Sequence, residues 1–160
     1  MRGVGAGLRT TDPAFVLATW FGVGRLPGAP GTWGSLAALP FAAMLAWLGG
    51  PWPVLLAAAA VFALGLWASA RYIAASGIDD PAPVVVDEVV GQWLTLALLP
   101  LTPISYVVGF ILFRIADMAK PWPANWIDRS VAGPWGVMLD DAVAGIYAGA
   151  GALILVGWLP

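Results

Sequence analysis

The sequence predicts an all-α fold: a compact polytopic membrane helical bundle with a re-entrant or short helical hairpin and its active-site loops on one face. Of the 160 residues, 61% are apolar and only 10% are charged, whereas about 25% are charged in typical soluble domains. The seven basic and nine acidic residues all fall in three windows, at 2–25, 71–88 and 114–141. No polar linker divides the chain, so we treat residues 1–160 as a single domain.

The first charge-free stretch, residues 26–70, predicts two membrane-crossing helices. Its 45 residues suffice for two passes of about 20 residues each. The sequence Gly-Gly-Pro-Trp-Pro at 49–53 supplies the turn between them, because Gly and Pro break helices. Trp47 and Trp52 suit the aromatic belt of the far membrane interface.

The second charge-free stretch, residues 89–113, is interrupted at its middle by Leu-Pro-Leu-Thr-Pro at 99–103. Two short helices joined by a turn fit this pattern better than one crossing. Limbs of about 11 residues would be about 16 Å long, too short to span unaided, so we expect a re-entrant or packed hairpin, or helices extended by flanking residues. With a hairpin, all seven Lys and Arg lie on one membrane face, which the positive-inside rule makes cytoplasmic. A single crossing would instead split the carboxylates between two sides.

Residues 142–160 predict a last helix that reaches the far side. Gly145 and Gly149 form a small-xxx-small spacing along it, with Ala148 and Ala152 beside them. Such a stripe permits close helix packing. Packing within one chain and a homo-oligomer interface both remain open, and we favour the former.

The absence of Cys and His excludes thiolate phosphatases, phosphohistidine enzymes, Ser-His-Asp hydrolases and the usual zinc sites. A net charge of -2 without a basic run also excludes the electrostatic signature of a nucleic-acid binder. Catalysis, if present, must therefore use carboxylates, Arg, Lys, hydroxyls and hard cations.

Carboxylates are concentrated in two segments near predicted helix ends. Pro81 and Pro83 keep the first segment extended, so that Asp87 and Glu88 open the following helix, where the helix dipole favours anions. We expect the pair at 140–141 to begin the last helix in the same way. Capping of a helix in water is the simpler interpretation of each segment taken alone.

Two further segments carry groups suited to binding phosphate. Arg114, Asp117 and Lys120 follow one stripe of a helix end, which is also the pattern of an ordinary ion-pair ladder. Residues 28–35 place Gly at every third position, with Ser35 as the expected N-cap of a helix. Backbone N–H groups and hydroxyls at a helix start can cradle phosphate, although most Gly-Pro loops are only loops.

Taken together, these segments bring seven carboxylates to one membrane face, where they would repel one another without a cation between them. Mg²⁺ is the natural candidate, because it prefers oxygen ligands and needs neither His nor Cys. The seven are Asp79, Asp80, Asp87, Glu88, Asp117, Asp140 and Asp141.

Four strings closely resemble the phosphatidylglycerophosphatase A family: APGTWGSLAALP at 29–40, VVVDEVVG at 84–91, LFRIADMAKPWP at 112–123 and DRSVAGPWGVMLDDAVAG at 128–145. The resemblance implies a Mg²⁺-dependent phosphatase that converts phosphatidylglycerophosphate in the lipid bilayer to phosphatidylglycerol and phosphate during phospholipid biosynthesis. It also implies a multi-pass protein of the bacterial cytoplasmic (inner) membrane with its active site facing the cytoplasm.

The resemblance further implies roles for individual residues. The implied metal ligands are Asp80, Asp87, Glu88, Asp117, Asp140 and Asp141, of which Asp87, Glu88, Asp117 and Asp141 are also implied to be catalytic. The implied phosphate-binding residues are Thr32, Ser35, Arg114, Lys120 and Arg129. Attack by an activated water and an aspartyl-phosphate intermediate are both open.

Other functions are compatible with parts of the sequence. A phosphatase of another membrane lipid phosphate, such as an isoprenoid one, would use the same groups. A small non-enzymatic membrane carrier would need acids inside its crossing helices, yet all nine lie in the charged windows. A purely structural membrane protein leaves the clustered acids without a reason, and a soluble helical homologue would have to bury the apolar helices in a core.

Overall fold

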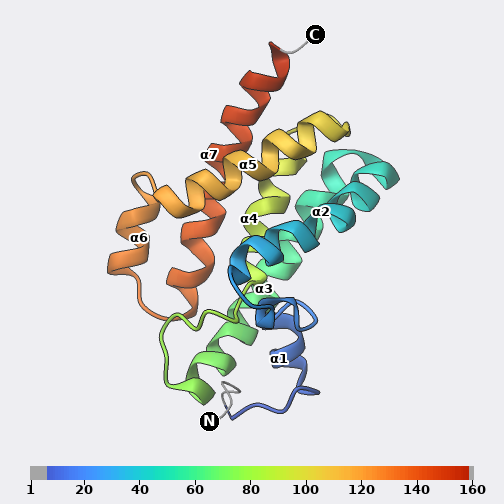
Figure 1. Cartoon of the computed structure of the whole chain (residues 1–160). Coiled ribbons are helices and arrows are strands. Elements are labelled where there is room, and N and C mark those ends of the chain that lie inside the picture. The colour runs from blue at the N-terminus through green and yellow to red at the C-terminus, as the bar shows by residue number, and fades with distance from the viewer. Residues whose placement is uncertain (1–6, 159–160) are drawn as a thin grey trace.

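The computed structural model describes residues 7–158, which form seven α-helices and one short 3₁₀ helix, with no strand in that range (Figure 1). This confirms the predicted all-α class. The elements are α1 (Pro13–Ala18), η1 (Val23–Arg25), α2 (Pro30–Gly49), α3 (Pro51–Ser76), α4 (Val86–Ala97), α5 (Pro103–Ala119), α6 (Ala124–Ser130) and α7 (Pro134–Gly157).

Three helices, α2, α3 and α7, are long and apolar enough to cross a membrane. Buried residues make up only 22%, 28% and 44% of their most apolar windows, so most of this apolar surface faces outward. At the turn between α2 and α3, the side chains of Trp47 and Trp52 are 78% and 70% exposed. A soluble protein rarely exposes so much contiguous apolar surface, and the chain is therefore a membrane-associated protein.

The predicted hairpin is present as α4 and α5. Helix α4 ends at Ala97, and α5 begins at Pro103 with the Thr102 hydroxyl accepting a hydrogen bond from the Ser105 N–H. The 12 residues of α4 correspond to about 18 Å and cannot span a bilayer alone. Helix α5 is 17 residues long because it continues into the charged window and includes Arg114 and Asp117. Helix α4 lies at the centre of the bundle, in contact with α2, α3, α5 and α7.

Small residues let α7 pack directly against the backbone of α4. A Cβ placed on Gly145 would lie 2.3 Å from the Gly91 carbonyl oxygen, and one on Gly149 would lie 3.1 Å from the Thr95 carbonyl oxygen. The Thr95 hydroxyl lies 3.0 Å from the carbonyl oxygens of both Gly91 and Gly145. The small-residue stripe thus serves packing within one chain.

Two helices begin earlier than the sequence analysis predicted. Helix α2 starts at Pro30, so Ser35 lies inside it and donates to the Gly31 carbonyl at 2.9 Å instead of capping it. Helix α7 starts at Pro134 rather than at Asp140. In both cases proline occupies the first helical position, where its missing N–H costs nothing and its φ is already helical.

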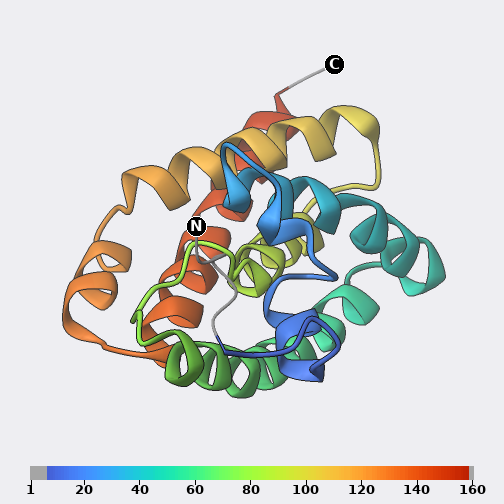
Figure 2. The same ribbon diagram turned by 60° about the horizontal axis from the view of Figure 1, so that its bottom comes forward.

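The charged segments meet at one end of the bundle. The turns at 49–51 and 98–102 lie toward the other end, in the upper part of Figure 1, together with the C-terminus. In Figure 2 the green segment 77–85 passes beside the start of α7, close to α6. The hairpin therefore returns the chain to the charged end, as predicted, before α6 and α7 begin.

Candidate active site

A cavity of about 540 Å³ opens at the charged end of the bundle. It is lined by the start of α2, the segment before α4, the first turn of α4, the end of α5, and the chain from α6 into α7. Four stretches of the sequence, within residues 29–31, 79–88, 114–120 and 128–141, therefore share one cavity. Its charged lining residues are Asp79, Asp80, Asp87, Glu88, Arg114, Asp117, Lys120, Asp128, Arg129, Asp140 and Asp141.

The first turn of α4 supplies two acids to this cavity. Helix α4 begins at Val86, directly after the proline-containing segment, so that Asp87 and Glu88 occupy its first turn as predicted. The side chain of Asp87 is buried, and Asp87 Oδ1 and Glu88 Oε2 both lack a hydrogen-bond partner in the described chain. Buried carboxylate oxygens without partners are costly, which indicates that a positively charged or donating group belongs there.

Helix α7 contributes two further buried acids that point in different directions. Asp140 and Asp141 are 5% and 4% exposed and occupy the second turn of the helix. Neighbouring helical residues project about 100° apart. Accordingly, Asp141 joins Asp87 and Glu88 in a cluster in which one carboxylate oxygen of each residue lies within 4.8 Å of the other two, whereas Asp140 accepts a hydrogen bond from Lys120 Nζ at 2.6 Å.

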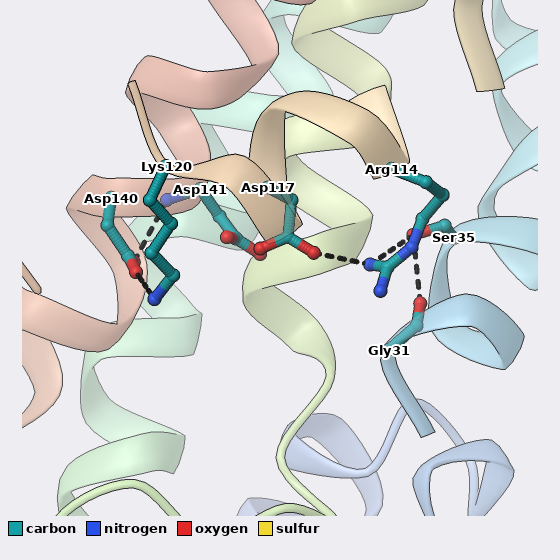
Figure 3. Close-up of polar contacts among 7 residues, drawn as sticks. All are labelled: Gly31, Ser35, Arg114, Asp117, Lys120, Asp140 and Asp141. Atoms are coloured by element: carbon teal, nitrogen blue, oxygen red, sulfur yellow. Dashed lines mark hydrogen bonds and ion pairs between the residues drawn. The ribbon is translucent and has the colours of Figure 1, made fainter. Parts of the chain in front are cut away.

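Helix α5 places a cation and an acid beside this cluster. Arg114 Nη1 donates to Asp117 Oδ2 at 2.5 Å and to the Ser35 hydroxyl at 3.4 Å (Figure 3). The carboxylate of Asp117 also approaches that of Asp141. One arginine thus connects the start of α2 to the acidic cluster.

Lys120 follows the last residue of α5 and links two acids. Its backbone is left-handed, with φ +44°, and its ammonium pairs with both Asp128 and Asp140. Burial alone would lower the pKa of Lys120, but the hydrogen bonds to the two carboxylates outweigh it and raise that pKa above its ordinary value of 10.5. Lys120 is therefore protonated throughout the physiological range.

The donor set fits a hard divalent cation such as Mg²⁺. The cluster of Asp87, Glu88 and Asp141 offers only carboxylate oxygens, and two of these carboxylates carry a buried oxygen without a partner in the described part of the chain. The sequence contains no His or Cys that could favour another metal. Two oxygens bound to one Mg²⁺ are at most about 4.2 Å apart. Ligand atoms gathered within 4.8 Å need only small side-chain rotations to share an ion.

The structure sorts the residues singled out by sequence. Asp80 and Arg129 line the cavity but are exposed and lie outside the three-acid cluster. Thr32 is half-buried and does not line the cavity, and Ser35 is fully buried behind Arg114. All seven acids and three cations that the sequence analysis named therefore line the cavity, whereas the two hydroxyls do not.

Two features of the site escaped the sequence analysis. Asp128 shares Lys120 with Asp140; its place beside Arg129 within a matched string was the available signal. A Cβ on Gly31 would lie 2.2 Å from Glu88 Oε1, so the glycine permits the close approach of α2 to α4. Nothing in the local sequence reports such an approach between distant segments.

Comparison with known proteins finds one matching family model and relatives that cover most of the chain. The model of the family described as phosphatidylglycerophosphatase A matches residues 16–156. Phosphatidylglycerophosphatase A of Escherichia coli is 41% identical over 152 residues, covering 94% of this chain and 87% of the relative. The protein of the same name from Haemophilus influenzae is 37% identical over 138 residues, covering 86% and 85%.

A third relative carries a different name. A protein of Bacteroides thetaiotaomicron named "Putative phosphatidylinositol-3-phosphatase" is 38% identical over 152 residues, covering 85% of this chain and 91% of the relative. No solved structure matches the chain significantly. All three relatives are therefore named for phosphate removal from a lipid, and they differ in the head group.

Proposed function

Because the chain belongs to the phosphatidylglycerophosphatase A family, we propose that it hydrolyses the terminal phosphate of phosphatidylglycerophosphate to give phosphatidylglycerol, with Mg²⁺ as cofactor. The observation that carries this proposal is the cluster of Asp87, Glu88 and Asp141 beside cations in one cavity. Two of the three relatives are named for this activity.

The acids of the cluster are the residues that would hold Mg²⁺, with Asp117 close to Asp141. When bound, the ion would supply positive charge to phosphate oxygens and to the attacking group. A carboxylate of the cluster accepts the proton of the nucleophile, which is general-base catalysis.

The basic residues of the cavity bind the phosphate. Arg114 and Lys120 are each held by an acid, Asp117 and Asp140 respectively, so that their positions are fixed before substrate arrives. Pre-positioned cations stabilise the charge on the equatorial oxygens without reorganisation. Arg129, at the exposed rim of the cavity, is available to an incoming head group.

The membrane location follows from the helices. Lipid phosphates lie at the bilayer surface, and the cavity lies at the charged end of three long apolar helices. We propose that this end faces the cytoplasm of a bacterial inner membrane, since basic residues favour that side.

The direct test is phosphate release from phosphatidylglycerophosphate by the purified protein in detergent. We expect release with Mg²⁺ and none after EDTA. Asp87→Asn and Asp141→Asn should each abolish turnover while leaving the melting temperature near that of the parent protein, and Asp12→Asn, which does not line the cavity, should remain active. Release that survives EDTA would remove the metal from the proposal.

The head group is tested by competition. Phosphatidylinositol 3-phosphate is the relevant competitor because the Bacteroides relative is named for it, and an isoprenoid phosphate represents the other lipid class. We expect phosphatidylglycerophosphate to have the highest kcat/KM of the three. A higher value for either competitor would reassign the substrate and leave the phosphatase chemistry intact.

A further inference from the structure

Gln92 is a buried amide that the proposed chemistry does not use. Its side chain is fully buried in α4, and neither Oε1 nor Nε2 has a hydrogen-bond partner within residues 7–158. Leaving the hydrogen bonds of a buried polar group unmade destabilises a protein. Trp93, next to it, donates from Nε1 to the Ala38 carbonyl at 2.9 Å, so the region does supply partners where geometry allows.

Gln92 lies one helical turn below Glu88 on the same face of α4. Residues four apart on a helix are neighbours, and Gln pairs readily with an acid at this spacing. Glu88 and Arg114 both reach the start of α2, because a Cβ on Gly31 would lie 2.2 Å from Glu88 Oε1 and 3.1 Å from Arg114 Nη1. Gln92 is therefore placed beneath the point where a cluster acid and a phosphate-binding cation converge.

The groups without partners in this region complement one another. Glu88 Oε2 is a buried acceptor and Arg114 Nε is a buried donor, and neither has a partner in the described structure. Gln92 offers one group of each kind. One amide therefore carries both of the groups that these two atoms lack: an N–H donor for Glu88 Oε2 and a carbonyl acceptor for Arg114 Nε.

We infer that Gln92 is a positioning residue that joins Glu88 to Arg114 when the cavity is loaded, and so orients the cluster carboxylate toward the metal and the guanidinium toward the phosphate. The inference rests on the proposed metal site. Groups that orient metal ligands in this way typically change metal affinity 10–100-fold when removed.

The test is Mn²⁺ binding to the detergent-solubilised protein without substrate, followed by electron paramagnetic resonance. Gln92→Met keeps the length of the side chain and removes both hydrogen-bonding groups. We expect it to weaken Mn²⁺ binding at least tenfold and to raise the dissociation constant of inorganic phosphate, with an unchanged or higher melting temperature because a buried amide without partners in the described residues is gone. Gln92→Glu, which keeps the size but sets a second carboxylate against Glu88, should weaken binding at least as much.

Two variants separate positioning from packing. Thr95→Val, one turn further along α4, removes hydrogen bonds that are already made and should lower the melting temperature without changing the Mn²⁺ affinity. Ser69→Ala, in α3, removes another buried hydroxyl that lacks a partner among residues 7–158 and should leave the affinity unchanged. If Gln92→Met binds Mn²⁺ and phosphate like the parent protein, the positioning role is wrong and the proposed function stands. If the parent protein binds no Mn²⁺, both fail.

Discussion

Glycine at position 31 keeps the first turn of α2 against the carboxylate of Glu88. An added methyl group would lie 2.2 Å from Glu88 Oε1, closer than non-bonded atoms approach without displacement, and 3.1 Å from Arg114 Nη1, which is a tight contact. The backbone of Gly31 is helical, so the glycine is needed for this contact and not for its conformational freedom.

We therefore expect Gly31→Ala to lower kcat for phosphatidylglycerophosphate at least tenfold, because both Glu88 and Arg114 must move. The melting temperature should change little, because the preference of alanine over glycine for helix, about 1 kcal/mol, offsets the strain of the added methyl group. Leu36→Ala, at an exposed position of the same helix, is the control and should retain activity. Equal kcat values for Gly31→Ala and the parent protein would show that Glu88 has room to adjust.

Lys120 stabilises the fold as well as the site. Lys120→Gln would leave Asp140, 5% exposed, buried without its cation, and breaking such a pair costs about 3–5 kcal/mol. Since the folded-state pKa of Lys120 is raised above 10.5, its stabilising contribution is complete below pH 10.5 and is lost as the pH rises through the folded-state pKa.

The melting-temperature difference between Lys120→Gln and the parent protein should therefore be constant from pH 7 to 9 and shrink at strongly alkaline pH. Arg71→Gln removes an exposed ion pair with Asp12 and should cost less than about 1 kcal/mol. A difference for Lys120→Gln no larger than that of Arg71→Gln would mean that Asp140 finds another partner.

At the scale of helices, local signals in the sequence predicted the elements well where Gly and Pro punctuate them. The turn at 49–53 joins α2 to α3, and the turn at 99–103 joins α4 to α5. The two misplaced helix starts came from choosing a polar cap, Ser35 or Asp140, over the proline signals at Pro30 and Pro134.

The acids and cations of the cavity were predictable because this chain has few charged residues. Their grouping in three short windows indicated a functional role. Their pairing was not predictable. Asp140 binds Lys120, whereas Asp141 joins the cluster. Which of the two acids takes which position depends on the rotation of α7 about its axis. That rotation is set by contacts between distant segments, such as that of Gly145 with Gly91.

The contact between α7 and α4 predicts a coupled loss of stability and activity. Gly145→Ala would press a methyl group against the Gly91 carbonyl, 2.3 Å away, and overpacking of this kind costs about 1–3 kcal/mol. Because Asp141 lies one turn before Gly145, α7 would also carry its carboxylate away from Asp87. We expect a lower melting temperature together with weaker Mn²⁺ binding.

Gly151→Ala tests the specificity of that effect on the same helix. The nearest atom to its new methyl group would be a Leu112 side-chain carbon at 3.7 Å, an ordinary contact. This variant should be neutral or slightly stabilising. If both glycine variants behaved alike, the close approach of α7 to α4 would not matter to the site.

At the scale of the whole molecule, the cavity exists only because the hairpin of α4 and α5 reverses the chain inside the bundle. With the chain returning to the charged end after α3 and again after α5, we expect the segment before α4 and the segment after α6 to lie on the same side of the membrane. The chain contains no cysteine, so single cysteines can report sidedness without background.

We expect Ala82→Cys and Ser130→Cys, both exposed, to react with a membrane-impermeant maleimide from the same side of sealed vesicles, and Trp52→Cys at the turn between α2 and α3 to react from the other. Labelling each variant again after detergent is added distinguishes cysteines that face the other side of the membrane from cysteines that the folded protein makes inaccessible. The first two positions both line the cavity. If they labelled from opposite sides, the acids of α4 and α7 could not share a metal ion, since an aqueous site cannot be assembled from both surfaces of a bilayer about 30 Å thick.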